Sequence, residues 1–234
     1  MKGVFRFKQF AVDQYGCAMK INTDGVLLGA TAMQENAGAI LDIGTGTGVI
    51  AMMLAQRFPD ASVDAVEIDA QATQTAGLNF ASSPFSTRLE AYHNDIASYE
   101  TQTRYDLIVS NPPYFVDDLK NPEARKRVAR HTDHSFFIAL LQKASALLAP
   151  GGSMWLILPL KQAGFIKDQA PVYGLHLQRR IDISSDENKP VIRQIIVLGH
   201  RQEEVKTEHF YIYEREGFHT EAYRRLLKDF FLAF

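Results

Sequence analysis

The sequence contains one cysteine, Cys17, among its 234 residues. A lone cysteine excludes an internal disulfide and a cysteine-rich zinc site, and it fits a reducing compartment. No run approaches the ~18 consecutive apolar residues of a membrane helix. Residues 1–8 alternate charged and aromatic side chains and lack the apolar core of a signal peptide. We therefore expect a cytoplasmic protein with no membrane partner and, because no cluster of metal ligands stands out, no bound metal.

The sequence also lacks a basic excess, because its formal net charge is only −2. This near-neutral total hides two segments of opposite sign. Residues 60–106 contain eight acidic and two basic side chains, whereas residues 120–131 contain five basic and one acidic. With 46% hydrophobic residues, the chain can bury a substantial core. We expect one α/β domain over 1–234, with 1–35 as an N-terminal extension made of a strand or hairpin and a helix.

Two features of that extension bear on function. Phenylalanines alternate with bases after residue 4, which predicts a short strand or hairpin arm. The arm either packs under the domain or faces RNA, since interleaved bases and aromatics suit phosphates and nucleobases. A helix is predicted over 26–33, with Thr23 or Asp24 as its N-cap.

A glycine-rich turn, 44–48, joins an apolar strand at 39–43 to a helix at 49–57. This strand–turn–helix pattern is typical of nucleotide-binding folds. It is not a dinucleotide fingerprint, because Val49 stands where the third glycine would be, and it lacks the lysine of a P-loop. Asp42 precedes the turn and favours a cationic or hydroxyl-rich ligand over a pyrophosphate. S-adenosylmethionine fits, because it carries an ammonium, a sulfonium and a ribose but no phosphate.

Acidic side chains follow the next two predicted strands. Glu67 ends the strand at 63–67 and stands 25 residues after Asp42, near the spacing at which an acid reaches ribose hydroxyls. A helix is predicted over 70–81, and a third strand at 88–93 leads to Asp95, which can accept from the adenine amino group. Ile68 is expected to pack on the adenine. The predicted cofactor-binding residues are Asp42, Gly44, Thr45, Gly46, Gly48, Glu67, Ile68, Asp95, Ile96 and Asn111.

The fourth predicted strand, 105–110, ends at the segment Asn111-Pro112-Pro113-Tyr114. Two prolines fix φ and donate no hydrogen bonds, so the chain leaves the strand as a stiff corner. Asn111 Oδ1 and the Pro112 carbonyl form a pair of acceptors for a flat group with two N–H bonds, and the Tyr114 ring offers a stacking face. We predict these three residues to be catalytic. Because ligands bind beyond the carboxyl ends of doubly wound strands, all four strand ends point to one site.

These motifs resemble the class I S-adenosylmethionine-dependent methyltransferases, and Asn-Pro-Pro-Tyr resembles their amino-methylating branch. The resemblance implies a Rossmann-like α/β fold with a seven-stranded, mostly parallel sheet and helices on both faces. Further strands predicted at 153–159, 176–183 and 191–199 bring the number of strands to seven. A helix is predicted at 133–148. Trp155 is expected in the core, and residues 223–231 form an apolar stripe that docks on the domain.

The flanking segments are similar to the bacterial tRNA(Val) adenine-N6 methyltransferases. They are Phe7–Phe10, Cys17–Lys20, Thr23–Gly29, Ala129–His131 and Lys189–Arg193, together with 221–232. The resemblance implies transfer of a methyl group from S-adenosylmethionine to N6 of the adenosine next to the anticodon, with S-adenosyl-L-homocysteine as product. It implies tRNA as partner and a monomer or weak dimer. The predicted RNA-binding residues are Lys8, Lys20, Arg125, Lys126, Arg127 and Arg130.

Other functions remain open at this point. The Asn-Pro-Pro-Tyr corner also suits a glutamine N5-methyltransferase acting on a protein, a DNA adenine-N6 methyltransferase or a ribosomal guanine-N2 methyltransferase. The basic segment 120–131 has the alternative reading of a solvated helical face. A cofactor sensor without catalysis is disfavoured, because binding alone would not require this corner.

Overall fold

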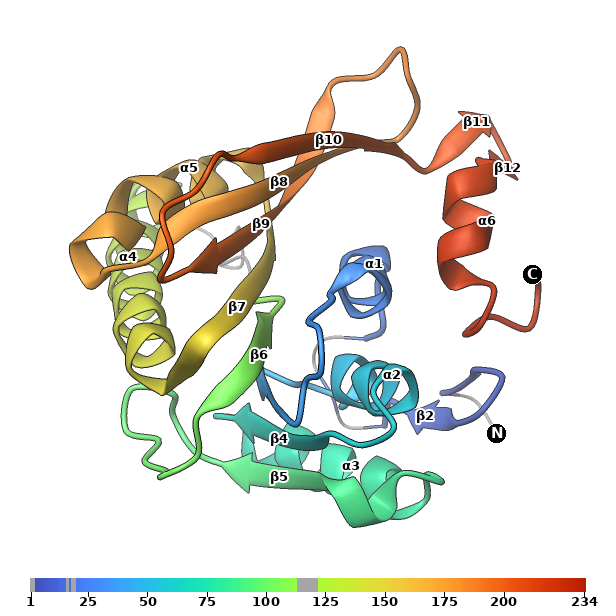
Figure 1. Ribbon diagram of the computed structural model, residues 1–234. Coiled ribbons are helices and arrows are strands. Elements are labelled where there is room, and N and C mark those ends of the chain that lie inside the picture. The colour runs from blue at the N-terminus through green and yellow to red at the C-terminus, as the bar shows by residue number, and fades with distance from the viewer. Residues whose placement is uncertain (1–2, 16, 18–19, 113–121) are drawn as a thin grey trace.

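A computed structural model of the chain describes residues 3–15, 17, 20–112 and 122–234, without the side chains of 122–133. Its centre is an eight-stranded sheet with the order β10-β8-β9-β7-β6-β3-β4-β5 (Figure 1). The strands are β3 (Ala39–Ile43), β4 (Ser62–Glu67), β5 (Leu89–His93), β6 (Tyr105–Ser110), β7 (Leu148–Leu158), β8 (His176–Ser184), β9 (Val191–Gly199) and β10 (Lys206–Tyr211).

The central strands β5, β4, β3, β6 and β7 run parallel to one another. Strand β9 is antiparallel to both of its neighbours, β7 and β8. The chain order reverses between β3 and β6: β4 and β5 extend the sheet on one side, and β6 and β7 on the other. Such a reversal is the topological switch point at which open α/β sheets bind ligands.

The predicted fold class is confirmed, but the sheet has eight strands and not seven. The additional strand, β10, pairs in parallel with β8 at the sheet edge. Its first four residues are exposed and polar, so no apolar alternation marked it in the sequence. The Arg179 guanidinium donates two 2.8 Å hydrogen bonds to the Glu208 carboxylate across this edge.

Helices cover both faces of the sheet (Figure 1). One face packs against α1 (Thr23–Thr31), α2 (Val49–Arg57) and α3 (Ala70–Ala81). The other packs against α4 (Pro122–Leu147) and α5 (Leu160–Gln169). Strand side chains alternate accordingly: Ile40 belongs to the first core and Leu41 to the second. Trp155 is buried as predicted. Single 3-10 turns, η1 (Ser86–Arg88) and η2 (Ala170–Tyr173), precede β5 and β8.

The predicted N-terminal hairpin is present as β1 (Val4–Arg6) and β2 (Ala11–Asp13). Phe7 pairs with Phe231, and its ring stacks on Phe10 at 4.5 Å. The C-terminal segment comprises β11 (Tyr213–Arg215), β12 (Phe218–His219) and α6 (Glu221–Leu227). Phe7 and Phe10 of the hairpin connection belong to the core over α1 and α2, as do Tyr223 and Leu227 of α6, so both ends of the described chain pack on one face.

Two helix starts differ from the predicted ones. The N-cap of α1 is Asn22, one residue before Thr23 and two before Asp24, because the Asn22 side chain accepts the Gly25 N–H. Helix α4 begins at Pro122 and not near 133. Its first turns are polar and lack the apolar spacing on which the sequence prediction depended.

Candidate active site

Four predicted site segments meet at one edge of the sheet. Ile43 of β3 pairs with Val66 on one side and with Ser110 on the other, and Glu67 of β4 pairs with His93 of β5. These residues end their strands, so the glycine turn, Glu67, the 94–96 segment and Asn111 follow one another along the same edge. The juxtaposition predicted from the sequence is therefore confirmed.

The glycine turn has three left-handed positions, with φ of +74° at Gly44, +57° at Gly46 and +82° at Gly48. A Cβ added to Gly48 would lie 2.4 Å from Phe80 Cε1, so this glycine permits close packing on α3. No described heavy atom lies within 4 Å of a Cβ built on Gly44 or Gly46. The first two glycines therefore border open space, where a ligand can approach the backbone.

Asp42 lies fully buried beneath this turn. Its Oδ2 accepts the Thr45 hydroxyl at 2.6 Å and the Ala51 N–H at 3.2 Å. Its Oδ1 has no hydrogen-bond partner within the described residues. Burial raises the pKa of Asp42 to about 7, against the lowering effect of its two hydrogen bonds. A cation at this turn would favour the ionised carboxylate, which fits a positively charged cofactor.

Glu67 lies at the rim of the turn. Its Oε2 accepts the Gly46 N–H at 2.9 Å, and its Oε1 accepts the Asp69 N–H at 3.0 Å. These bonds fix the carboxylate, and each oxygen retains capacity for a further donor such as a ribose hydroxyl. The neighbouring Ile68 side chain is 66% exposed, an unusual position for a large apolar group. It offers an apolar surface for an aromatic ring.

The segment after β5 contributes one polar side chain. Asp95 is exposed, and its Oδ1 accepts the Ala97 N–H at 2.9 Å. The Asn94 N–H donates to the Glu67 carbonyl at 2.9 Å, which attaches this segment to the end of β4. Ile96, in contrast, is buried in the core beneath α4, so its side chain packs inward and leaves only its backbone for a ligand.

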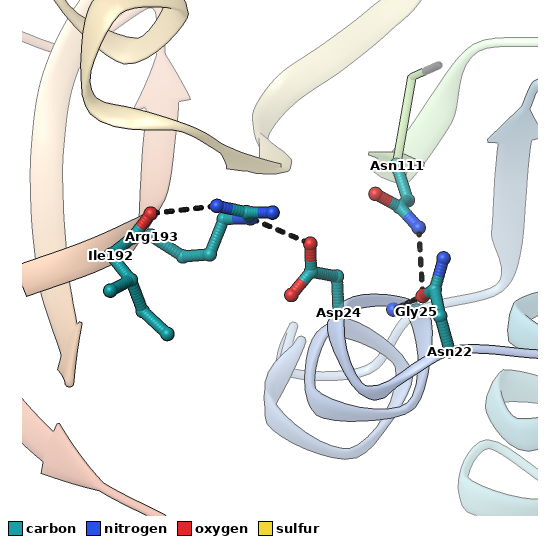
Figure 2. Close-up of polar contacts among 6 residues, drawn as sticks. All are labelled: Asn22, Asp24, Gly25, Asn111, Ile192 and Arg193. Atoms are coloured by element: carbon teal, nitrogen blue, oxygen red, sulfur yellow. Dashed lines mark hydrogen bonds and ion pairs between the residues drawn. The ribbon is translucent and has the colours of Figure 1, made fainter. Parts of the chain in front are cut away.

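The corner after β6 is attached to the glycine turn by Ser110. Its buried hydroxyl donates a 2.7 Å hydrogen bond to the Ile43 carbonyl. Asn111 follows, half-buried, and its Nδ2 lies 3.5 Å from Asn22 Oδ1 (Figure 2). Pro112 is buried. Tyr114, predicted as the stacking residue, lies outside the described residues.

Sequence reasoning did not assign Ser110 and Asn22 to the site. Ser110 reads as the last residue of a strand, and nothing in the sequence identifies the carbonyl that it meets. Asn22 could have been predicted as an N-cap, because asparagine is a preferred cap whose side-chain oxygen accepts the backbone N–H three residues later. The neighbouring Thr23 and Asp24 are equally good caps and masked it.

The predicted RNA-binding residues do not gather in one described cluster. Lys8 is exposed, and its ammonium donates to the carbonyls of Lys228 and Phe234. Lys20 is exposed just ahead of α1. The remaining four are in the first turns of α4, where only the backbone is described; they are Arg125, Lys126, Arg127 and Arg130.

The described residues contain neither a candidate metal site nor a candidate membrane span. No group of three or more histidine, cysteine, aspartate or glutamate side chains there could hold a metal ion. No described helix combines the length and the apolar character needed to span a membrane.

Comparison with known proteins places this site in a class. The family model for the methyltransferase small domain matches residues 17–164, which include the glycine turn and Asn111. Solved methyltransferases have the same fold. A predicted O-methyltransferase from Agrobacterium tumefaciens aligns with a TM-score of 0.67 over 88% of this chain and 96% of its own, at 19% identity. A methyltransferase from Pyrococcus furiosus aligns with a TM-score of 0.55 over 80% and 91%, at 22% identity. The fold is that of a class I methyltransferase, and the chain belongs to the family of the methyltransferase small domain.

Curated relatives narrow the class. A tRNA1(Val) (adenine(37)-N6)-methyltransferase from Pedobacter heparinus is 60% identical over the full length of both chains. One from Dyadobacter fermentans is 40% identical over 98% of both. The chain belongs to the family of the tRNA1(Val) (adenine(37)-N6)-methyltransferases.

Proposed function

We propose that this protein transfers the methyl group of S-adenosylmethionine to the exocyclic N6 of an adenosine in tRNA, next to the anticodon of tRNA(Val). The observation that carries the proposal is the position of Asn111, at the end of β6 and one strand away from the glycine turn of β3. The tRNA and the position follow from the names of the relatives in the family.

The residues around the turn fit the cofactor. Gly44 and Gly46 border open space, Asp42 holds an unpartnered buried oxygen among the described residues, and the Glu67 carboxylate is fixed at the rim. Asp42 would favour the positive charge, Glu67 the ribose hydroxyls, and Asp95 and Ile68 the adenine. Bound there, S-adenosylmethionine supplies an electrophilic methyl group.

The corner residues act on the attacking nitrogen. The adenine amino group is a poor nucleophile, because its lone pair is delocalised into the ring. Hydrogen bonds from its two N–H groups to Asn111 Oδ1 and the Pro112 carbonyl favour a pyramidal nitrogen and localise that pair. The same acceptors stabilise the positive charge that grows on nitrogen during attack, and their position is fixed before reaction. The proton leaves after transfer.

No covalent nucleophile is required. Burial raises the pKa of the Cys17 thiol, with smaller contributions from nearby acids, so this cysteine favours its protonated and unreactive form. Positioning of the two substrates supplies much of the remaining rate enhancement.

The RNA is held outside this corner. Lys8, Lys20 and the basic first turns of α4 would neutralise phosphates, and Tyr114 would stack on the adenine. An adenosine in a loop is easily unstacked, which lowers the cost of inserting it. We propose that 1–234 acts as one methyltransferase domain in the cytoplasm, with 1–35 as its extension, and as a monomer or weak dimer.

Methyl transfer from labelled cofactor tests this function. The purified protein is offered total tRNA, ribosomal RNA, DNA and protein from a cell that lacks the activity, followed by nucleoside mapping. We expect label in N6-methyladenosine of tRNA alone, and an unmodified tRNA(Val) transcript should accept it. Label in glutamine would favour protein N5-methylation, and label in DNA or in guanine would favour the other nucleic-acid methyltransferases.

A further inference from the structure

The amide of a catalytic asparagine can point in two ways. A flip about its last bond exchanges an oxygen that accepts hydrogen bonds with an NH2 group that donates them. Only one orientation presents Asn111 Oδ1 to an amino group, and the other would present two donors to it. Discrimination between these orientations is therefore part of the chemistry.

In this fold a backbone N–H decides the orientation. The Gly25 N–H can only donate, and it lies 2.8 Å from the Asn22 side chain, so the Asn22 atom facing it is the oxygen. The same oxygen faces the Asn111 amide at 3.5 Å, so the group that Asn111 turns toward it is its NH2. Asn111 Oδ1 then lies on the opposite side of its amide, directed away from Asn22 (Figure 2).

The start of α1 is held from a second side. Asp24 Oδ2 accepts from Arg193 Nε at 2.7 Å, and Arg193 Nη1 also donates to the Ile192 carbonyl at 2.9 Å (Figure 2). These contacts attach the first turn of α1 to β9. A Cβ on Gly25 would lie 3.5 Å from both Asn111 Nδ2 and Asn22 Oδ1, an ordinary van der Waals distance, so this residue adjoins both amides.

We propose that Asn22 is a positioning residue for Asn111, and that the N-cap of α1 fixes the catalytic amide in its accepting orientation. This role rests on the proposed function. At 3.5 Å the contact is long, and contacts of this kind commonly tighten when the substrate binds. Asn22 has two tasks, to cap α1 and to orient Asn111, and substitutions can separate them.

Asn22→Ser and Asn22→Asp form a matched pair. Serine, aspartate and asparagine cap helices about equally well, so both variants should retain the stability of α1. Aspartate also reaches Asn111 Nδ2 with an acceptor oxygen, whereas the shorter serine does not. We expect Asn22→Ser to lower kcat about 10- to 100-fold with little change in KM for S-adenosylmethionine, and Asn22→Asp to restore most of it. Equal kcat in serine and wild type, or an equal loss in both variants, would overturn the proposal.

A double variant and a capping control separate the positioning role of Asn22 from an effect on stability. In Asn111→Ala there is no amide to orient, so adding Asn22→Ser should not reduce the residual turnover further; a reduction as large as in wild type would contradict the positioning role. Thr220→Ala removes the N-cap of α6, where Thr220 accepts the Tyr223 N–H. It should lower stability and leave kcat unchanged.

The contact between Asn22 and Asn111 can also be measured by NMR, without an activity assay. The side-chain NH2 signals of Asn111, assigned by their loss in Asn111→Ala, should shift in Asn22→Ser and change little in Asn22→Asp. If these shifts occur but wild type transfers no methyl group to tRNA, the proposed function fails while the contact stands. If wild type is active and the Asn111 signals are the same in all three proteins, the positioning proposal fails alone.

Discussion

The hydroxyl of Ser110 donates a 2.7 Å hydrogen bond to the carbonyl of Ile43 on the neighbouring strand. These two residues immediately precede the two functional segments of the site, Asn111 and the glycine turn. The bond lies at the switch point of the sheet, where the strands on either side run in parallel. The relative position of Asn111 and the glycine turn is therefore set by the pairing of β3 with β6 and by a buried side chain.

Asn111→Ala should abolish most turnover and still bind S-adenosylmethionine, because the other predicted cofactor-binding residues remain. Loss of one preorganised contact to a developing charge commonly costs about 10²–10³ in rate. Single-turnover transfer to tRNA measures the rate, and calorimetry measures binding of S-adenosylmethionine. Turnover within tenfold of wild type would show that Asn111 does not have the proposed role.

Ser110→Ala should lower both stability and turnover. It leaves the buried Ile43 carbonyl without this donor, at a cost of about 1–3 kcal/mol in the free energy of unfolding, and frees the corner from β3. Urea denaturation and kcat are the measurements. Ser62→Ala is the control, since the Ser62 hydroxyl makes a 3.3 Å bond to the Gly38 carbonyl at the opposite end of the sheet. Equal effects of the two substitutions on kcat would contradict the prediction.

Glu67→Ala should weaken binding of S-adenosylmethionine. The substitution removes the carboxylate, so the Gly46 N–H loses its acceptor and the ligand loses any bond to this side chain. Hydrogen bonds to charged groups contribute about 1.5–3 kcal/mol, which corresponds to about a 10- to 100-fold change in Kd. Calorimetry provides the measurement. Glu90→Ala, an exposed acid on the adjacent strand β5, should bind like wild type; unchanged affinity in Glu67→Ala would refute the assignment.

Asp42 should make stability decrease with rising pH. Burial raises its pKa from an ordinary 3.8 to about 7 in the folded chain. Between these values the folded state binds more protons than the unfolded state, so this group's stabilising contribution is complete below about pH 4 and is lost as the pH rises to about 7. Asn is neutral throughout, so Asp42→Asn should flatten this part of the profile in urea denaturation. An unchanged slope in Asp42→Asn would count against a raised pKa.

Joint replacement of Arg125, Lys126 and Arg127 by alanine should lower the affinity for tRNA and make that affinity less dependent on salt concentration. Each lost phosphate contact lowers the slope of log K against log salt concentration by about 0.7 to 0.9. Filter binding at several salt concentrations measures the slope, with Lys161→Ala on α5 as control. A slope equal to that of wild type would mean that this segment is a solvated face.

Much of the core of the fold could be read from the sequence. Strands β3, β6 and β9 have the predicted bounds, because their largely apolar runs end at glycine, proline or polar residues, and helices α2 and α3 also have the predicted bounds. Strand β10 was missed, since pairing at a sheet edge requires no apolar face. The start of α4 was missed, since a polar helical turn carries no periodic signal.

The site could be predicted to the level of segments but not of contacts. Strand ends bring Asp42, Glu67 and Asn111 to one edge, and a parallel sheet requires this. The burial of Ile96 and the contact from Asn111 Nδ2 to Asn22 Oδ1 depend on side-chain directions between elements far apart in the chain. Local sequence pattern does not contain that information.

Asn79 of α3 connects the N-terminal hairpin to the glycine turn. Its amide nitrogen donates to the carbonyls of Asp13 and Thr47, both at 2.9 Å, and its oxygen accepts the Asp13 N–H at 2.9 Å. The side chain is 5% exposed, so no solvent would replace these partners. The hairpin therefore supports the glycine turn through Asn79, and removing it would leave this buried amide without its partners at Asp13 and make the turn less rigid.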